Sequence, residues 1–189
     1  MIRYYNAQYM QLKSIITASI IAFLLISSSS SIAGLKVGDK APNFSLQDQN
    51  NIIHTLRDYE SQWVILYFYP KDDTPGCTTQ ACDFRDAVKR IIASKAVVFG
   101  LSLDSVASHK LFAEKYNLSF SLLADEAGEV SELYDSLSKL LVYKVAKRNT
   151  FIVDPKGNIV KIYLSVDPKT HSQMVLSDLE RLQKSGDEL

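Results

Sequence analysis

The sequence predicts an α/β fold in which strands and helices alternate and a hairpin comes near the end. Two apolar runs, Trp63 to Tyr69 and Ala96 to Leu103, have the β-branched and aromatic content of strands buried on both faces. Each run is followed by a segment with helical periodicity. Strand, helix and strand in succession indicate parallel pairing through right-handed crossovers. A chain of 189 residues can bury one substantial core.

The first half of the chain contains two strand and helix pairs. Pro70 ends the first apolar run, and the segment after Cys77 places its apolar residues on one helical stripe. After the second run, Ser105 is expected to cap a helix that ends at Tyr116. The stripe of the first helix consists of Ala81, Phe84, Val88, Ile91 and Ile92.

The second half adds shorter elements. Ser121 to Ala124 is short and strand-like, and Asp125 to Leu137 is expected to form a helix with an acidic first turn. Thr150 to Asp154 and Ile159 to Leu164 flank a Pro-Lys-Gly-Asn turn, which predicts a hairpin. An amphipathic helix is expected from about Lys169 to Lys184.

Charge and composition argue against several functional classes. Lys plus Arg equals Asp plus Glu at 21 each, so the sequence indicates no nucleic-acid surface and no acidic partner. No P-loop or dinucleotide-binding glycine pattern is found, and we expect no cofactor. His54, His109 and His171 are scattered along the chain and are expected at the surface or in loops. No metal site is expected either, because the two cysteines lack a nearby histidine to complete a ligand set.

Cys77 and Cys82, the only two cysteines, lie directly after the first apolar run. The residues between Pro70 and Cys77 are short and polar apart from Thr-Pro-Gly, so Cys77 is expected at or near a helix N-terminus. A helix start presents unpaired N–H groups and the positive end of the helix dipole, which both favour an anion. A thiolate is such an anion, and this position should therefore activate Cys77 more than Cys82.

The spacing of the two cysteines suggests a conformational step. Positions five apart on a regular α-helix have Cα atoms about 8 to 9 Å apart, whereas a disulfide needs Cα atoms closer than about 7 Å. If both residues are helical when reduced, the first turns must unwind before the sulfurs can bond. This hypothesis makes the helix start a two-state element of a redox cycle.

A structural bridge in an exported protein is the alternative explanation for two cysteines. A bridge that closes only five residues removes little chain entropy from the unfolded state. It also gives no reason for Thr-Pro-Gly before the first cysteine at a strand-to-helix junction. The setting therefore favours redox chemistry on a thiol.

The segment resembles the active site of the peroxiredoxins, whose pattern is Pro, three residues, Thr, two residues and Cys. Pro70, Thr74 and Cys77 match it. The sequence is most similar to the bacterioferritin comigratory protein branch, also called the Q type, an atypical two-cysteine group. A resolving cysteine lies five residues after the peroxidatic one in this branch, and Cys82 fits that position. Further similarity covers Gly38 to Leu46 and Arg148 to Asp154, and so extends along most of the chain after residue 33.

The resemblance implies a thioredoxin-like fold, with a central mixed sheet flanked by helices, and a thiol-dependent peroxidase. Hydrogen peroxide and organic hydroperoxides would oxidise Cys77 to a sulfenic acid. Cys82 would resolve it as an intrasubunit disulfide, which a thioredoxin-like donor would reduce. The chemistry needs one chain only, so a monomer is expected, although a dimer is not excluded.

The resemblance also implies roles for the other matching residues. Thr74 would hydrogen-bond the peroxide and the sulfur, and Pro70 would shield the pocket and set the loop. Arg148 would lie beside Cys77 and polarise the peroxide. The N–H groups of Gly76 and Cys77 would stabilise charge on the leaving oxygen.

Ordinary structural roles remain open for each of these residues when it is taken alone. Arg148 would be a charge at a strand edge, and Thr74 a helix cap. Asp72 and Asp73 are expected to be loop and capping charges. Helical packing or solvent exposure accounts for Gln80 and Arg85.

Two other functions remain as alternatives. The first is an exported thiol-disulfide oxidoreductase on the same fold, although such enzymes usually carry Cys-x-x-Cys, and here four residues separate the cysteines. The second is a binding module with a structural bridge, which would leave Thr74 and Arg148 without a purpose.

The N-terminal 33 residues have the pattern of a secretory signal peptide. Arg3 and Lys13 precede an apolar run of 13 residues, which five serines, Ile32 and Ala33 follow. We expect cleavage after Ala33, export to the periplasm or another extracytoplasmic compartment, and a mature domain over residues 34–189. The run is short for a transmembrane helix of about 20 residues, but an uncleaved membrane anchor is the alternative. The C-terminal Gly-Asp-Glu-Leu is taken as a polar tail and not as a retention signal.

Overall fold

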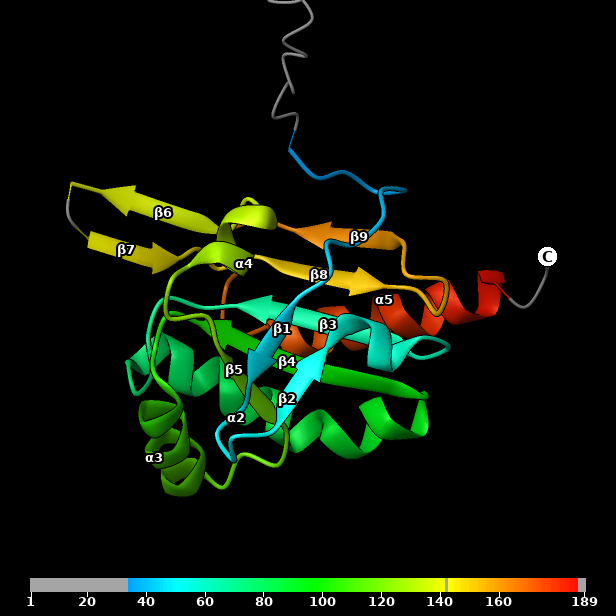
Figure 1. The fold of residues 1–189 in the computed structure, drawn as a ribbon. Helices are drawn as coiled ribbons and strands as arrows, with labels where there is room; N and C mark the ends of the chain where they lie inside the picture. Colours follow the sequence, from blue (N-terminus) through cyan, green and yellow to red (C-terminus); the bar gives the residue numbers. More distant parts are fainter. Residues whose placement is uncertain (1–33, 142, 187–189) are drawn as a thin grey trace, which may run out of the picture. The chain divides into compact units, whose positions relative to one another are not determined.

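The computed structural model describes residues 34–141 and 143–186. Its central element is a five-stranded sheet of order β5-β4-β3-β8-β9 (Figure 1). The strands β3 (Trp63–Phe68), β4 (Ala96–Ser102) and β5 (Ser121–Ala124) are parallel. β8 (Thr150–Val153) is antiparallel to both of its neighbours, β3 and β9 (Ile159–Tyr163). The predicted parallel crossovers and the C-terminal hairpin are thereby confirmed.

Helices cover one face of this sheet, and smaller elements cover the other. The core of the first face contains residues of α2 (Pro75–Ala93), α3 (Val106–Tyr116) and α5 (His171–Gly186). Three short elements contribute to the opposite core, β1 (Ser45–Gln47), η1 (Leu56–Tyr59) and α4 (Glu129–Leu133). The His54 ring of β2 (Ile53–Thr55) lies against Phe99 of the same core. The expected mixed sheet flanked by helices is therefore present.

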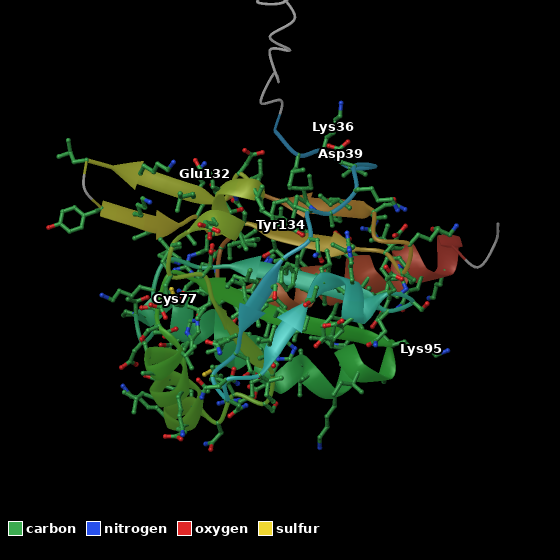
Figure 2. All side chains as sticks on the ribbon, in the orientation of Figure 1. Lys36, Asp39, Cys77, Lys95, Glu132 and Tyr134 are labelled. Atoms are coloured by element: carbon green, nitrogen blue, oxygen red, sulfur yellow. The ribbon has the colours of Figure 1, made fainter. Side chains whose placement is uncertain are left out.

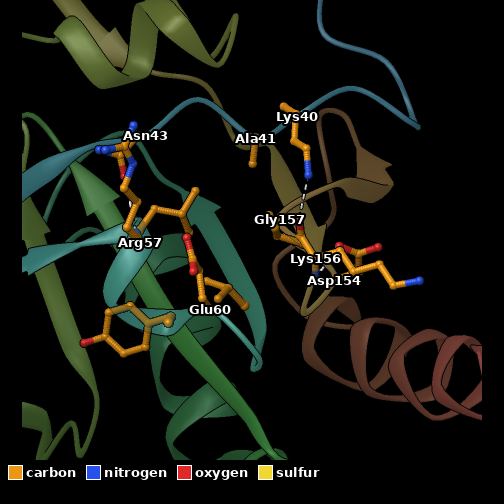
Figure 3. Close-up of a pocket in the computed structure, with 12 residues that line it drawn as sticks. Lys40, Ala41, Asn43, Arg57, Glu60, Asp154, Lys156 and Gly157 are labelled. Atoms are coloured by element: carbon orange, nitrogen blue, oxygen red, sulfur yellow. Dashed lines mark hydrogen bonds between the residues drawn. The ribbon is translucent and has the colours of Figure 1, made fainter.

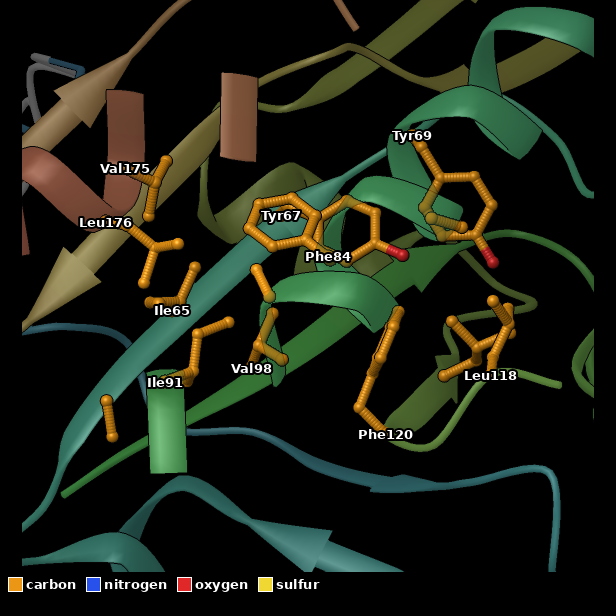
Figure 4. Packing of buried hydrophobic residues seen from close by; sticks show 14 of the residues in the cluster. Ile65, Tyr67, Tyr69, Phe84, Ile91, Val98, Leu118, Phe120, Val175 and Leu176 are labelled. Carbon is orange, nitrogen blue, oxygen red and sulfur yellow. The ribbon is translucent and has the colours of Figure 1, made fainter. Parts of the chain in front are cut away.

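The continuous apolar run of β3 is explained by its burial on both faces. Ile65 and Tyr67 point to the helical face, while Leu66 and Phe68 point to the other, because successive side chains of a strand alternate. The Tyr67 ring stacks on Phe84 of α2, with ring centroids 4.8 Å apart (Figure 4). Gly100 on β4 makes room for this ring, since a Cβ atom there would lie 2.6 Å from the Tyr67 hydroxyl oxygen.

The helix predicted from Asp125 to Leu137 is mostly wrong. Within that range only the five residues of α4 are helical. The helix is short because Gly128 before it has a φ of 77° and Asp135 after it has a φ of 50°, and both angles lie in the left-handed region. Leu137 belongs instead to β6 (Leu137–Leu140), which pairs with β7 (Tyr143–Ala146) in a separate antiparallel ribbon. The apolar stripe of α2 also needs one correction, because Ile92 is 65% exposed while Ile91 beside it is buried.

The three histidines were expected at the surface or in loops, but the structure buries them wholly or in part. His109 and His171 are fully buried, and His54 on β2 is partly buried against Asp48 and Tyr59. Each buried ring has a hydrogen-bond partner on another part of the chain, Asp72 in the loop before α2 for His109 and Thr150 on β8 for His171. These partners are distant in sequence, so the local pattern could not reveal them.

The expected signal peptide, residues 1–33, lies outside the described residues, and so do the last three residues of the Gly-Asp-Glu-Leu tail. Within the described ranges no helix has both the length and the apolar character needed to cross a membrane.

His171 should make the stability of the fold depend on pH. Burial lowers its pKa from 6.5 to about 4. The unfolded chain therefore binds a proton at a higher pH than the folded chain, so stability is complete above pH 6.5 and falls as the pH drops towards 4. Between pH 7 and pH 4.5, the free energy of unfolding should fall by about 2 to 3 kcal/mol less in His171→Phe than in the unsubstituted protein. Urea unfolding at both pH values measures this, and equal losses in the two proteins would contradict it.

Candidate active site

Cys77 lies in the first turn of α2, where the helix has no side-chain cap. Thr74 is the N-cap residue and Pro75 the first helical residue, and the first helical hydrogen bond runs from the Thr78 N–H to the Thr74 carbonyl at 2.8 Å. First-turn N–H groups have no partner within a helix, and no side chain of the N-cap residue occupies them here. The expected position of Cys77 at a helix N-terminus is confirmed. Figure 2 shows Cys77 at this end of the molecule, opposite Lys95, which follows the end of α2.

Arg148 contacts the sulfur of Cys77. Its Nη2 donates to the Cys77 Sγ at 3.3 Å, and its Nη1 donates to the Gln80 Oε1 at 2.8 Å. Cys77 is only 2% exposed, and Gln80 is fully buried one turn further along α2. A guanidinium stays charged and has donors fixed in one plane, so the two contacts orient it over the thiol. Arg148 is therefore a residue of the site and not an isolated charge at a strand edge.

Gln80 is a site residue that sequence reasoning missed, and the close approach of Gly76 to Arg148 was not foreseen either. The Gln80 amide oxygen fixes one side of the guanidinium, and its Nε2 has no hydrogen-bond partner among the described residues. A Cβ atom on Gly76 would lie 3.1 Å from the Arg148 Nη2, so glycine permits this close approach. The helical period, which places Gln80 three residues after Cys77, was the one sequence signal that could have found it.

The backbone around Arg148 is attached on two sides. The Val166 N–H donates to the Arg148 carbonyl at 3.1 Å, and the Phe68 N–H at the end of β3 donates to the Asn149 carbonyl at 2.8 Å. The buried Asn149 side chain donates to Ser136 at 3.0 Å. Arg148 thus precedes β8 at a point where the chain is tied to β3, the strand that leads to Cys77.

Cys82 lies on the same helix as Cys77 and is half-buried. Both cysteines are free thiols within one uninterrupted α2, as the sequence predicted. Arg85, one turn after Cys82, donates to the Tyr116 carbonyl at 2.7 Å and to Asp86 at 2.8 Å. Its hydrogen bond with Asp86, and to a lesser extent Cys82, raises the pKa of Arg85.

Thr74 and Pro70 flank the loop that leads to Cys77. Thr74 occupies the expected N-cap position, but its hydroxyl donates to the Lys71 carbonyl at 3.1 Å and makes no cap bond with its own helix. Pro70 is half-buried directly after the buried Tyr69. Both residues lie in the connection between β3 and α2, whereas their contacts with a peroxide stay predictions.

Aromatic side chains of β3 and of the residue after it lie beneath α2. Tyr67 is fully buried, and burial first and Cys77 next raise its pKa well above the ordinary value. Its hydroxyl therefore keeps its proton. Tyr67 and Tyr69 pack against Phe84, a residue of the helix that carries the thiols (Figure 4).

Asp72 and Asp73 differ in environment, and one expectation about them is wrong. Asp73 is an exposed loop charge paired with Lys115, as expected. Asp72 is buried and accepts hydrogen bonds from Tyr69 and His109. A carboxylate can be buried here because several donors surround it.

A pocket of about 380 Å³ lies away from the thiols (Figure 3). Its lining includes Lys40 and Val64, and Val64 is near the start of β3, whereas Cys77 follows the end of that strand. The Lys40 ammonium already donates to the Lys156 carbonyl at 2.6 Å. In residues 34–141 and 143–186, no group of three or more His, Cys, Asp or Glu side chains could hold a metal ion.

The site combines a buried thiol, a helix N-terminus and a guanidinium at hydrogen-bond distance. Unpaired N–H groups and Arg148 both stabilise negative charge, on the sulfur and on any oxygen that approaches it. A second thiol on the same helix offers a partner for an oxidised sulfur. These features define a redox enzyme that works through a thiol on a mixed α/β sheet.

Comparison with known proteins identifies the family. The AhpC/TSA family model matches residues 37–162. Peroxiredoxin Bcp of Bacillus subtilis is 38% identical over 154 residues, which cover 79% of this chain and 98% of that protein. PrxQ of Xylella fastidiosa superposes with a TM-score of 0.76 and 30% identity, over 80% of this chain and 99% of that chain. The Xanthomonas campestris bacterioferritin comigratory protein superposes with a TM-score of 0.70 and 31% identity, over 73% of this chain and 90% of that chain.

The chain therefore belongs to the AhpC/TSA family, and within it to the Bcp/Q peroxiredoxins, which are oxidoreductases that reduce peroxides. The thioredoxin-like fold expected from the sequence is confirmed by the same structures. None of the three relatives described above is named as a thiol-disulfide oxidoreductase.

Arg148→Ala should slow the reaction of Cys77 with peroxide by about 100-fold, because a preorganised charged donor at the reacting atoms is lost. Gln80→Ala should slow it by about tenfold, since Arg148 keeps its charge but loses the acceptor that orients it. Competition for hydrogen peroxide against a reference peroxidase measures both rates. Arg90→Ala is the control, because Arg90 is an exposed arginine near the other end of α2. An Arg148→Ala rate equal to that control would remove Arg148 from the site.

Proposed function

We propose that the protein is a thiol-dependent peroxidase in which Cys77 reduces a hydroperoxide and Cys82 then resolves the oxidised sulfur. The contact of the Arg148 Nη2 with the Cys77 Sγ at 3.3 Å, at the start of α2, carries the proposal. A structural cysteine has no need of a half-buried guanidinium fixed by a second residue. A peroxidatic thiolate does, because its charge must be stabilised away from bulk water.

In the first step the Cys77 thiolate attacks one oxygen of the peroxide bond. A sulfur–oxygen bond forms while the O–O bond breaks, so sulfur is oxidised to a sulfenic acid and the other oxygen leaves as an alcohol or water after it takes up a proton. Arg148 and the open N–H groups of Gly76 and Cys77 stabilise charge on the leaving oxygen. Thr74 turns its hydroxyl from the Lys71 carbonyl to the peroxide, and Pro70 shields the pocket.

In the second step Cys82 condenses with the sulfenic acid. A disulfide forms within one chain and one water molecule leaves. Two positions five apart on a regular helix have Cα atoms about 8 to 9 Å apart, which exceeds the reach of a disulfide. Since α2 contains both cysteines without a break, its first turns unwind before the bond forms.

In the third step a thioredoxin-type protein supplies two electrons and two protons that return both cysteines to thiols. The disulfide is intramolecular and Cys82 is half-buried in the reduced form, so unwinding of α2 also gives the reductant access to sulfur. No second copy of the chain takes part in any step.

Both hydrogen peroxide and organic hydroperoxides are proposed as substrates. Alkyl peroxide reduction activity is attributed to the Xanthomonas campestris bacterioferritin comigratory protein, one of the similar solved structures.

Cysteine variants test the peroxidase directly. The reduced domain of residues 34–189 should lose two thiols per hydrogen peroxide or cumene hydroperoxide, whereas Cys77→Ser should react no faster than free cysteine. Cys82→Ser should still form one sulfenic acid per chain, trapped by dimedone and counted by mass spectrometry, but should not turn over with thioredoxin. Full turnover by Cys82→Ser would remove Cys82 from the resolving step, and no reaction of the unsubstituted protein would overturn the proposal.

We propose in addition that residues 1–33 direct export. The support is the sequence pattern of a basic start, an apolar run and small residues before Gly34. An exported peroxidase works in an oxidising compartment, so it requires a dedicated electron donor there.

Expression of the full chain in a Gram-negative host should give a periplasmic protein whose first residue is Gly34. Cell fractionation followed by intact-mass measurement checks this result. An intact N-terminus in the membrane fraction would indicate an anchor, and an intact N-terminus in the cytosol would overturn export.

A further inference from the structure

Asp72 lies at the centre of a buried hydrogen-bond cluster that the peroxidase chemistry does not use. Its Oδ1 accepts from the Tyr69 hydroxyl at 2.7 Å, and its Oδ2 accepts from the Ser108 hydroxyl at 2.7 Å. The Oδ2 also lies 2.9 Å from the His109 Nδ1. A carboxylate has no proton to give, so His109 donates with Nδ1. Ser108 and His109 both belong to the first turn of α3.

Because this cluster is buried, each hydrogen bond to the Asp72 carboxylate matters for its stability. Asp72 is 7% exposed and His109 is not exposed at all. Burial by itself would raise the pKa of Asp72, but the hydrogen bonds from His109, Tyr69 and Ser108 outweigh it and keep that pKa below the ordinary value. A buried charge that loses one of its donors becomes costly. Loss of any one donor should therefore make release of the whole cluster easier.

The cluster holds the loop that leads into α2. Asp72 lies midway between the end of β3 and the Thr74 cap, only five residues before Cys77. The Asp72 N–H donates to the Asp104 carboxylate at 2.9 Å, which adds a bond to the end of β4. A second attachment to α3, from Asp73 to Lys115, is exposed. Exposed ion pairs contribute little stability, so the buried cluster carries most of the attachment.

We propose that Asp72, Ser108 and His109 form a clasp that opens when the first turns of α2 unwind, and that the clasp thereby limits the rate of the Cys77–Cys82 disulfide bond. The inference rests on the proposed function. These three are positioning residues, because none of them contacts the sulfur atoms. While the clasp is closed, α2 remains helical and the two thiols stay too far apart to bond.

The clasp decides between two fates of the Cys77 sulfenic acid. In one, Cys82 displaces its oxygen, the disulfide forms and water leaves. In the other, a second hydroperoxide transfers an oxygen atom to the sulfur, which becomes a sulfinic acid while the hydroperoxide leaves as an alcohol or water. A tighter clasp lengthens the life of the sulfenic acid and favours the second fate when peroxide is abundant.

His109→Leu should speed disulfide formation by about tenfold, the size expected when a buried carboxylate loses one donor. Formation of the sulfenic acid should keep its rate, because the closed form still predominates and Arg148 is untouched. Quenched-flow samples after one equivalent of hydrogen peroxide, analysed by intact mass with and without dimedone, give both rates. The peroxide concentration that produces sulfinic acid should rise in the same variant.

Three further variants make the test specific. His109→Asn keeps a nitrogen donor towards Asp72 and should restore the original rate of disulfide formation. Ser108→Ala removes one donor from the same carboxylate and should speed disulfide formation severalfold, and it decides the question if His109→Leu does not fold. Lys115→Met breaks the exposed pair on the same helix and should leave both rates unchanged.

The outcomes separate this inference from the proposed function. An unsubstituted protein that forms a disulfide normally, with folded His109→Leu or Ser108→Ala proteins that form it at the same rate or more slowly, would overturn the clasp alone. An unsubstituted protein that forms no sulfenic acid would overturn both.

Discussion

The contact between the Arg148 guanidinium and the Cys77 thiol is the constraint on which the rest of the site depends. The two residues are 71 positions apart in the chain, so the contact requires the β3-to-α2 junction and the segment before β8 to be held in register. The antiparallel pairing of β3 with β8 provides this register, and the bond from the Phe68 N–H to the Asn149 carbonyl extends it to the site. The buried sheet thus fixes a charge and a nucleophile that neither element could position alone.

The proposed reaction places opposite demands on α2. Attack on peroxide needs the helix intact, because its first turn supplies the open N–H groups and keeps Cys77 against Arg148. Disulfide formation needs the same turn to unwind, because a regular helix keeps sulfurs five residues apart out of reach. A helix start attached by few backbone hydrogen bonds suits both demands, since the first turn of any helix is the part with the fewest internal bonds.

Helix α3 contacts the chain on both sides of the two cysteines. Its first turn supplies the donors to Asp72, its last turn supplies the Lys115 and Tyr116 contacts to Asp73, and the Tyr116 carbonyl accepts from Arg85 on α2. The same helix therefore touches the loop before Cys77 and the helix after Cys82. The buried contacts to Asp72 cost more to break than the exposed contacts to Asp73, because water readily replaces the exposed ones.

The sequence by itself determined the strand and helix alternation, the position of Cys77 at a helix start and the family resemblance, because these depend on local periodicity, turn chemistry and a short motif. Periodicity also misjudged local details, since the left-handed backbone at Gly128 and Asp135 ends α4 early. Only the tertiary structure decided that Gln80 orients Arg148 and that His109 is buried on Asp72. Such pairs form between residues far apart in the chain, and a buried polar side chain is stabilised by partners that the sequence around it does not contain.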